Sequence, residues 1–201
     1  GENGSGKSTL LEAIADRCDF NAAGGGRQNS YEVHKAEAAL GDYIRLSWLP
    51  KVSNGFFLRS ETFYQFASHI DLLEYHPNKY AAFGGKSLHQ QSHGESFLAL
   101  FMNRFKGKAI YLLDEPEAAL SPTRQLSLLK IMKDLEREAQ FIIATHSPIL
   151  LGYPNATIYS FEEGGIESVR YEETIHYIVT KRFLNAPETI FAELFNEERK
   201  T

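Results

Sequence analysis

Hydrophobic positions along this chain follow two different periods, and the change from one to the other predicts a mixed α/β fold. Unbroken apolar runs at residues 109–113 and 141–144 are typical of strands that are buried on both faces of a parallel sheet. Elsewhere apolar residues recur three and four positions apart, which predicts helices with one buried face. These predicted helices cover residues 8–16, 61–73, 95–105, 123–138 with Pro122 at its start, and 174–195 with a break near Pro187.

Shorter strands are predicted on either side of this central region. Residues 43–49 alternate in strand fashion up to Pro50, and residues 55–59 form a second short run. Residues 157–161 and 166–171 are expected to pair as a hairpin, and residues 76–91 to form a polar loop. The sequence therefore predicts a mostly parallel sheet flanked by helices, with a small antiparallel portion.

Composition adds limits to this fold. The 201 residues are 43% hydrophobic and 23% charged, as expected for one globular domain, and the net charge of −5 gives no argument for a nucleic-acid surface. Cys18 is the single cysteine, which excludes an intrachain disulfide and favours a buried structural thiol in a reducing cytoplasm. No apolar run approaches the length that crosses a bilayer.

The first nine residues carry the strongest chemical pattern. Lys7 would reach the β- and γ-phosphates of a nucleotide, the Ser8 hydroxyl would bind Mg²⁺, and the following helix would add the positive end of its dipole. Gly85-Lys86-Ser87 resembles the last three residues of the phosphate-binding pattern G-x-x-x-x-G-K-[ST], but Tyr80 stands at the position where that pattern requires its first glycine. We therefore expect ATP and Mg²⁺ as cofactors of the segment that fits G-x-x-x-x-G-K-[ST], which is Gly1-Glu2-Asn3-Gly4-Ser5-Gly6-Lys7-Ser8-Thr9.

A phosphate-binding loop of this kind ordinarily follows a buried strand. This sequence has no residues before Gly1 and no initiator methionine. We therefore expect one domain over residues 1–201 whose first strand or strands lie outside the sequence, with a helical subregion at residues 61–105.

Two adjacent carboxylates follow the apolar run at 109–113. An aspartate at the carboxyl end of a strand beside a P-loop binds Mg²⁺ directly or through water, which is the role expected of Asp114. Glu115 is then placed to polarise the attacking water.

Four further segments, in order and at suitable spacing, resemble those of the ATP-binding cassette (ABC) ATPases. The resemblance covers residues 1 to about 161, and the sequence departs from it at His93, where glycine is usual. The segments are Leu112-Leu113-Asp114-Glu115-Pro116, similar to a Walker B motif with its catalytic glutamate; Ala119-Leu120-Ser121, similar to a D-loop; Ala144-Thr145-His146-Ser147, similar to a switch-histidine segment; and Gln91-Ser92-His93-Gly94-Glu95, similar to a signature motif.

The resemblance implies a mechanism for two copies of the chain. They would form a homodimer on ATP binding by closing head to tail, with Ser92 and Gly94 of each copy meeting the γ-phosphate held by the other. Glu115 would orient water, and His146 would sense the phosphate. Glu95 resembles the soluble, repair-type members more than the transporters.

The Q-loop of such proteins carries a residue that contacts Mg²⁺ and the attacking water. We assign this position to Glu61, with Arg59 as its neighbour, because Glu61 follows the strand predicted at 55–59. The alternative is that Ser60 and Glu61 only begin the next helix, as such residues often do.

Three biological roles fit an ABC-type ATPase. The first is a stand-alone ATPase of the AAA-family type related to SMC and recombination-repair proteins, which works in the cytoplasm on DNA repair or defence with nucleic acid or an effector protein as partner. The second is the nucleotide-binding subunit of an ABC transporter, with no transmembrane segment of its own. The third is the ATPase part of a nuclease system, with the nuclease encoded separately.

Overall fold

The computed structural model describes residues 4–21, 24–27, 40–49, 51–72, 79–162 and 165–197. The chain divides into two compact units, one formed by residues 6–145 and the other by residues 146–201 together with residues 1–5. The second half of the predicted P-loop belongs to the first of these units.

The unit of residues 6–145 is built on a parallel sheet. Its strands are β1 (Gly55–Arg59), β2 (Ala109–Asp114) and β3 (Ala139–Ala144), in the order β1-β2-β3. Arg59 pairs with Asp114, and Asp114 pairs with Ala144, so the three strands end at one edge of the sheet. The predicted parallel arrangement is confirmed, and this edge is where ligands collect in open α/β sheets.

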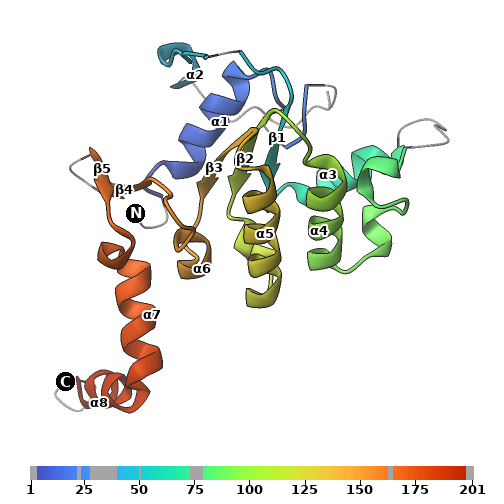
Figure 1. The fold of residues 1–201 in the computed structure, drawn as a ribbon. Coiled ribbons are helices and arrows are strands. Elements are labelled where there is room, and N and C mark those ends of the chain that lie inside the picture. The colour runs from blue at the N-terminus through green and yellow to red at the C-terminus, as the bar shows by residue number, and fades with distance from the viewer. Residues whose placement is uncertain are drawn as a thin grey trace. The chain divides into compact units, whose positions relative to one another are not determined.

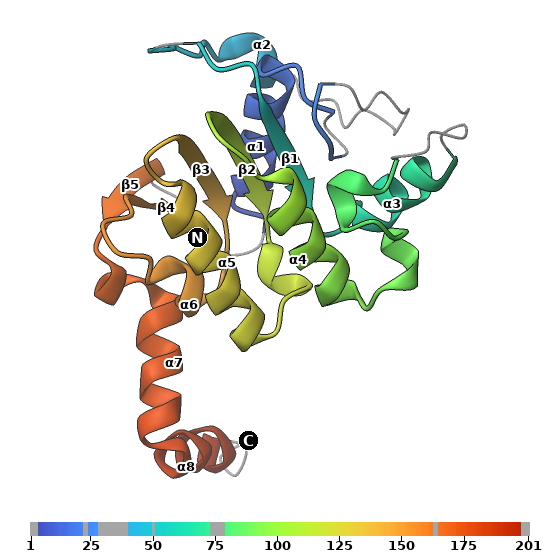
Figure 2. The same ribbon diagram turned by 45° about the vertical axis from the view of Figure 1, so that its right-hand side comes forward.

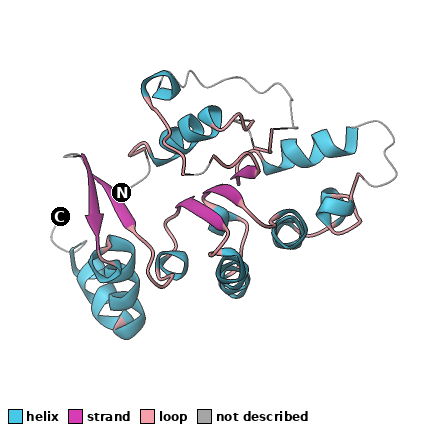
Figure 3. Ribbon diagram, turned by 45° about the horizontal axis from the view of Figure 1, so that its top comes forward, coloured by secondary structure: helices cyan, strands magenta, loops and turns pink. Residues whose placement is uncertain are grey.

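Helices cover both faces of this sheet (Figures 1 and 3). Helix α1 lies on one side, and α4 and α5 lie next to each other on the other side (Figure 2). The predicted helices are confirmed, with ends within a few residues of those expected. Their bounds are α1 Lys7–Arg17, α3 Phe63–Leu72, α4 His93–Arg104 and α5 Pro122–Leu135, with a short α2 at Leu40–Tyr43.

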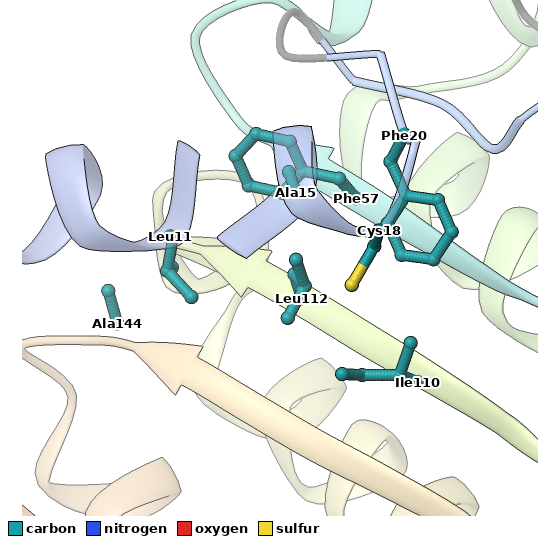
Figure 4. Packing of buried hydrophobic residues seen from close by; sticks show 8 residues of the cluster. All are labelled: Leu11, Ala15, Cys18, Phe20, Phe57, Ile110, Leu112 and Ala144. Atoms are coloured by element: carbon teal, nitrogen blue, oxygen red, sulfur yellow. The ribbon is translucent and has the colours of Figure 1, made fainter. Parts of the chain in front are cut away.

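The apolar side of α1 forms a core with one face of the sheet (Figure 4). Leu11, Ala15 and Cys18 of this helix segment pack with alternate residues of the strands, such as Phe57 and Leu112. Burial raises the pKa of the Cys18 thiol to about 11, so the thiol stays protonated and behaves as a small apolar side chain. The predicted structural role of this cysteine is confirmed.

The opposite face of the sheet is aromatic. Phe56 and Tyr111 point to this face because successive strand residues alternate sides, and Phe105 at the end of α4 contacts both of them. The ring centroids of Phe105 and Tyr111 are 3.9 Å apart, and those of Phe63 and Phe97 are 4.1 Å apart. Each buried aromatic ring contributes about 2–3 kcal/mol, so these contacts hold α3 and α4 against the strands that carry the site.

The strand expected at residues 43–49 does not form. Tyr43 is the last residue of α2, and residues 44–49 have no strand structure. Leu46 and Trp48 instead pack on the core beside α1, which accounts for the alternating pattern. A strand also needs a neighbour for its backbone hydrogen bonds, and alternation alone does not supply one.

The loop predicted at 76–91 contains two short 3-10 helices, Ala81–Phe83 and Leu88–Gln90. Ser87 is the N-cap of the second one, and its hydroxyl donates a hydrogen bond of 2.7 Å to Asp71 Oδ2. Residues 73–78, which include the start of the predicted loop and the last residue of the predicted helix, lie outside the described ranges.

The other unit contains the predicted hairpin and the helices at the end of the chain. Strands β4 (Ile158–Glu162) and β5 (Gly165–Val169) pair antiparallel, which confirms the hairpin. Short helix α6 (Pro148–Leu151) is joined to the turn before α7 by a hydrogen bond from Tyr171 Oη to the Pro148 carbonyl. Helices α7 (Ile175–Asn185) and α8 (Pro187–Glu197) are separated at Pro187 as predicted. Within the described ranges no helix is long and apolar enough to cross a membrane.

Candidate functional site

The P-loop segment requires glycine for its backbone conformation. Gly4 and Gly6 have φ angles of +80° and +92°, which side-chain-bearing residues rarely adopt, although a Cβ at either would meet nothing within 4 Å. Gly6 is the N-cap of α1, and Lys7 begins the helix. The remaining predicted residues of this loop are Gly1, Glu2 and Asn3, which lie outside the described ranges, and Ser5, Ser8 and Thr9.

Ser8 and Asp114 are brought together although they are 106 positions apart in the sequence. Ser8 lies in the first turn of α1, and Asp114 is the last residue of β2. The Ser8 hydroxyl donates a hydrogen bond of 3.0 Å to Asp114 Oδ1. The end of the strand thus faces the start of the helix, which is the geometry expected for a P-loop serine and its partner aspartate.

These two side chains fit a Mg²⁺ ion that is completed by phosphate. Mg²⁺ prefers oxygen ligands and is usually bound by one or two carboxylates together with substrate phosphates and waters. Among the described residues, no group of three or more His, Cys, Asp or Glu could hold a metal ion. A hydroxyl beside a buried carboxylate supplies two oxygen atoms of the kind that Mg²⁺ prefers.

Burial changes the acidity of Asp114. Its side chain is 8% exposed, and burial raises the pKa from 3.8 to about 6, against the opposing effects of the Ser8 hydrogen bond and the Arg59 charge. Glu115 and Glu12 add smaller upward contributions. The ionised carboxylate is thus destabilised in the protein without a metal, and a cation that binds here relieves this cost.

We expect the nucleotide-free protein to lose stability through Asp114 as the pH rises from 4 to 7. Because the folded pKa of about 6 lies above the ordinary value of 3.8, the folded state binds the proton more tightly than the unfolded state. The contribution is fully present below pH 3.8 and is lost as the pH passes 6, with a size of about 3 kcal/mol. Urea unfolding at several pH values measures it.

The control for this experiment is Asp114→Asn, which keeps the shape of the side chain and removes its titration. The difference in unfolding free energy between the two proteins should change by about 3 kcal/mol between pH 3 and 7. Parallel pH profiles for the two proteins would contradict the prediction.

Arg59 connects Asp114 with two other carboxylates, although the sequence pattern indicated it only as a neighbour of Glu61. Its Nη1 is 2.7 Å from Glu12 Oε1, its Nη2 is 3.3 Å from Glu61 Oε2, and its Nε is 3.6 Å from Asp114 Oδ2. Glu12 is a buried residue that sequence reasoning missed. Its position four residues after Ser8, on the same side of α1, was the available signal.

The predicted metal contact Glu61 lies at the outer side of this cluster. Its side chain is 80% exposed and contacts Arg59, which in turn approaches Asp114. The structure therefore brings Glu61 to Arg59, and the predicted contact with Mg²⁺ stays a prediction.

Glu115 has an unusual backbone conformation. It lies directly after β2 with φ +48° and ψ +51°, a left-handed conformation that costs a non-glycine residue about 1–2 kcal/mol. Three hydrogen bonds hold it there: its N–H donates to the Ala144 carbonyl at 2.9 Å, and its own carbonyl accepts from the Ser60 hydroxyl at 2.6 Å and from the Ala118 N–H at 3.0 Å. Strain of this kind concentrates at functional positions, and the catalytic role of this carboxylate stays a prediction.

Ser92 and Glu95 begin helix α4. The Ser92 N–H and hydroxyl both donate to Glu95 Oε2, at 2.9 and 2.6 Å, and these hydrogen bonds lower the pKa of Glu95. Such contacts are typical of a helix start. The γ-phosphate contact predicted for Ser92, Gly94 and Glu95 stays a prediction.

Gly94 has a packing reason to be glycine. A Cβ at this position would lie 2.2 Å from Arg124 Nη1 and 3.0 Å from the Ala119 carbonyl oxygen. Arg124 Nη2 also approaches Glu95 Oε1 at 3.8 Å. The segment that resembles a signature motif is therefore in direct contact with the segment that resembles a D-loop.

His146 belongs to the other unit. Its Nδ1 lies 3.2 Å from Nε2 of His176 in α7, and the two rings meet edge to face. This contact fixes how the imidazole is oriented within its own unit. Its predicted role toward a γ-phosphate stays a prediction.

Residues 91–152 match a family model described as "AAA domain, putative AbiEii toxin, Type IV TA system". This match supports a P-loop ATPase-like domain, and the parallel three-stranded sheet with a separate antiparallel pair fits a P-loop NTPase-like fold. An AAA domain suggests a nucleotide-binding ATPase. No curated protein matches the chain.

Proposed function

We propose that the protein binds ATP together with Mg²⁺ and hydrolyses it to ADP and phosphate, in the manner of an ABC-type ATPase. The observation that carries this proposal is the hydrogen bond between Ser8 and Asp114. It joins the helix that begins in a P-loop sequence to the aspartate that ends a buried strand, which is where a nucleotide-bound metal would be needed.

Each residue of the site has a chemical role in this proposal. Lys7 binds the β- and γ-phosphates, and Ser8 with Asp114 holds Mg²⁺. The bound metal supplies positive charge that stabilises the transferred phosphoryl group. Glu115 accepts a proton from the attacking water, and His146 contacts the γ-phosphate.

In the proposed mechanism, a single copy of the chain does not complete this site. We propose that two copies close on ATP as a homodimer, each with Ser92 and Gly94 on the nucleotide of the other. These residues lie at the N-terminus of α4, where the positive end of the helix dipole favours an anion.

The work driven by hydrolysis is proposed to lie in DNA repair or defence in the cytoplasm, with nucleic acid or an effector protein as partner. The description of the matching model, which names a toxin of a type IV TA system, favours defence. The other proposed roles are an ATPase partner of a separately encoded nuclease and the nucleotide-binding subunit of an ABC transporter.

Replacing Lys7 by alanine is expected to weaken ATP binding by about 10- to 100-fold, because a charge-assisted hydrogen bond to phosphate is lost. Titration with a fluorescent ATP analogue measures the effect. The chain offers a matched control in Lys86, an exposed lysine that follows Gly85 and precedes Ser87. Ser87 is occupied by its hydrogen bond to Asp71, so Lys86→Ala should bind ATP as the wild type does. Equal affinities in all three proteins would contradict the proposed function.

A further inference from the structure

Arg59 is held close to the candidate metal site by a contact that does not involve the metal ligand. Its side chain is 17% exposed, and the side chain of its partner Glu12 is 11% exposed, so their 2.7 Å ion pair is largely removed from water. Glu12 lies on α1 one turn after Ser8, and Arg59 ends the strand next to that of Asp114. The guanidinium is thus anchored between the helix and the sheet.

The contact between Arg59 and Asp114 is much looser. The distance from Nε to Oδ2 is 3.6 Å, and Nε has no hydrogen-bond partner among the described residues. Asp114 is also the less exposed of the two side chains, so its negative charge depends on nearby cations for compensation. Arg59 therefore supplies charge to Asp114 without the strong hydrogen bond that would fix the pair.

A cation anchored in this way can lose its contact with Asp114 at small cost. A metal that binds Asp114 replaces an unbonded Nε contact, while the ion pair of Arg59 with Glu12 remains. The positive charge also repels a second cation, and this effect is large at such short range in a partly buried site.

We propose that Arg59 takes the place of Mg²⁺ beside Asp114 while no nucleotide is bound, and so prevents the site from binding a metal ion alone. This inference rests on the proposed function of the same site. Arg59 acts through Asp114 and is therefore a positioning residue. The metal ion therefore binds together with the nucleotide, because phosphate oxygens are needed to overcome the repulsion from Arg59.

The test is the affinity of the nucleotide-free protein for Mn²⁺, a spectroscopically visible substitute for Mg²⁺, measured by electron paramagnetic resonance. Arg59→Met removes the charge and keeps most of the side-chain stem, and it should raise Mn²⁺ affinity by about tenfold or more. Arg59→Lys restores a positive charge and should bind Mn²⁺ nearly as weakly as the wild type. Adding Asp114→Asn to Arg59→Met should abolish the gain.

Arg104→Met is the matched control. Arg104 is also partly buried, and its guanidinium lies over the ring of Phe56 at 5.8 Å from the centroid. Its removal disturbs packing without removing charge beside Asp114, so Mn²⁺ affinity should not change. If Arg59 had only a structural role, Arg59→Met would likewise leave the Mn²⁺ affinity unchanged. Circular dichroism confirms that each variant is folded, and Arg59→Gln replaces Arg59→Met if the latter is not.

Unchanged Mn²⁺ affinity in the folded Arg59→Met or Arg59→Gln protein would overturn the inference. The inference would also be overturned if Arg59→Met still raised the Mn²⁺ affinity in a protein that carries Asp114→Asn. ATP binding to the wild type tests the proposed function separately. If the wild type did not bind ATP, the Mn²⁺ measurement on the nucleotide-free protein would be unaffected.

Discussion

Glu115→Gln is expected to lower ATP turnover by about 10²- to 10⁴-fold while ATP binding is preserved. Glutamine has nearly the same shape as glutamate and can hold a water molecule, but it cannot accept a proton from it. The backbone of residue 115 is held by hydrogen bonds to Ala144 and Ser60 that do not involve its side chain. The substitution should therefore leave the local structure intact, and phosphate release at saturating ATP measures its effect.

Glu117→Gln is the control for this substitution. Glu117 lies in the short 3-10 helix Pro116–Ala118, two residues after Glu115. Replacing it makes the same change from carboxylate to amide at a position with no predicted catalytic role. Its turnover should remain close to that of the wild type. Near-normal turnover in Glu115→Gln, or an equal loss in both variants, would remove Glu115 from the catalytic role.

Ser92→Arg is expected to abolish ATP-dependent dimers completely. In a Glu115→Gln background, which preserves bound ATP, the protein should be monomeric without nucleotide, dimeric with ATP and Mg²⁺, and monomeric with ADP. Because ATP binds the dimer better than the monomer, it shifts the equilibrium by that difference in affinity. A long side chain at position 92 would occupy the place where the γ-phosphate of the other copy must dock. Light scattering coupled to size exclusion gives the mass.

This substitution also removes the hydrogen bonds that Ser92 makes to Glu95 through its hydroxyl. Loss of a helix cap costs about 1 kcal/mol, so ATP binding by the monomer must be shown to be intact. Ser53→Arg is the control, because Ser53 is exposed and precedes β1, at the opposite edge of the sheet from Asp114. A Ser92→Arg protein that still dimerises would mean that residues 91–95 only begin a helix.

Local patterns determined most of the secondary structure. The runs at 109–113 and 141–144 are β2 and β3, and the periodic segments between and around them are helices, because burial of an apolar face depends on the period of the pattern. The loop conformation at the P-loop glycines could also be predicted, because Gly4 and Gly6 adopt positive φ angles that other residues avoid. Asp114 could be placed at the carboxyl edge of a sheet because its strand is a continuous apolar run.

Other features depended on contacts between distant parts of the chain. Residues 44–49 alternate as a strand would, yet they pack as a coil on the core, because alternation does not reveal whether a pairing partner is present. The left-handed backbone of Glu115 is held by residues 60 and 144, and the tight space at position 94 comes from the Ala119 carbonyl oxygen and the Arg124 side chain.

The charge network around Asp114 shows the same limit most clearly. The sequence determined that a carboxylate would end β2 and that a serine would follow the P-loop lysine, because both belong to local motifs. The position of Arg59 between Glu12 and Asp114 depends on long-range packing and could not be predicted from these motifs. The physical reason is that strand register and helix orientation set which charges meet, and both are fixed by the packing of the two faces of the sheet.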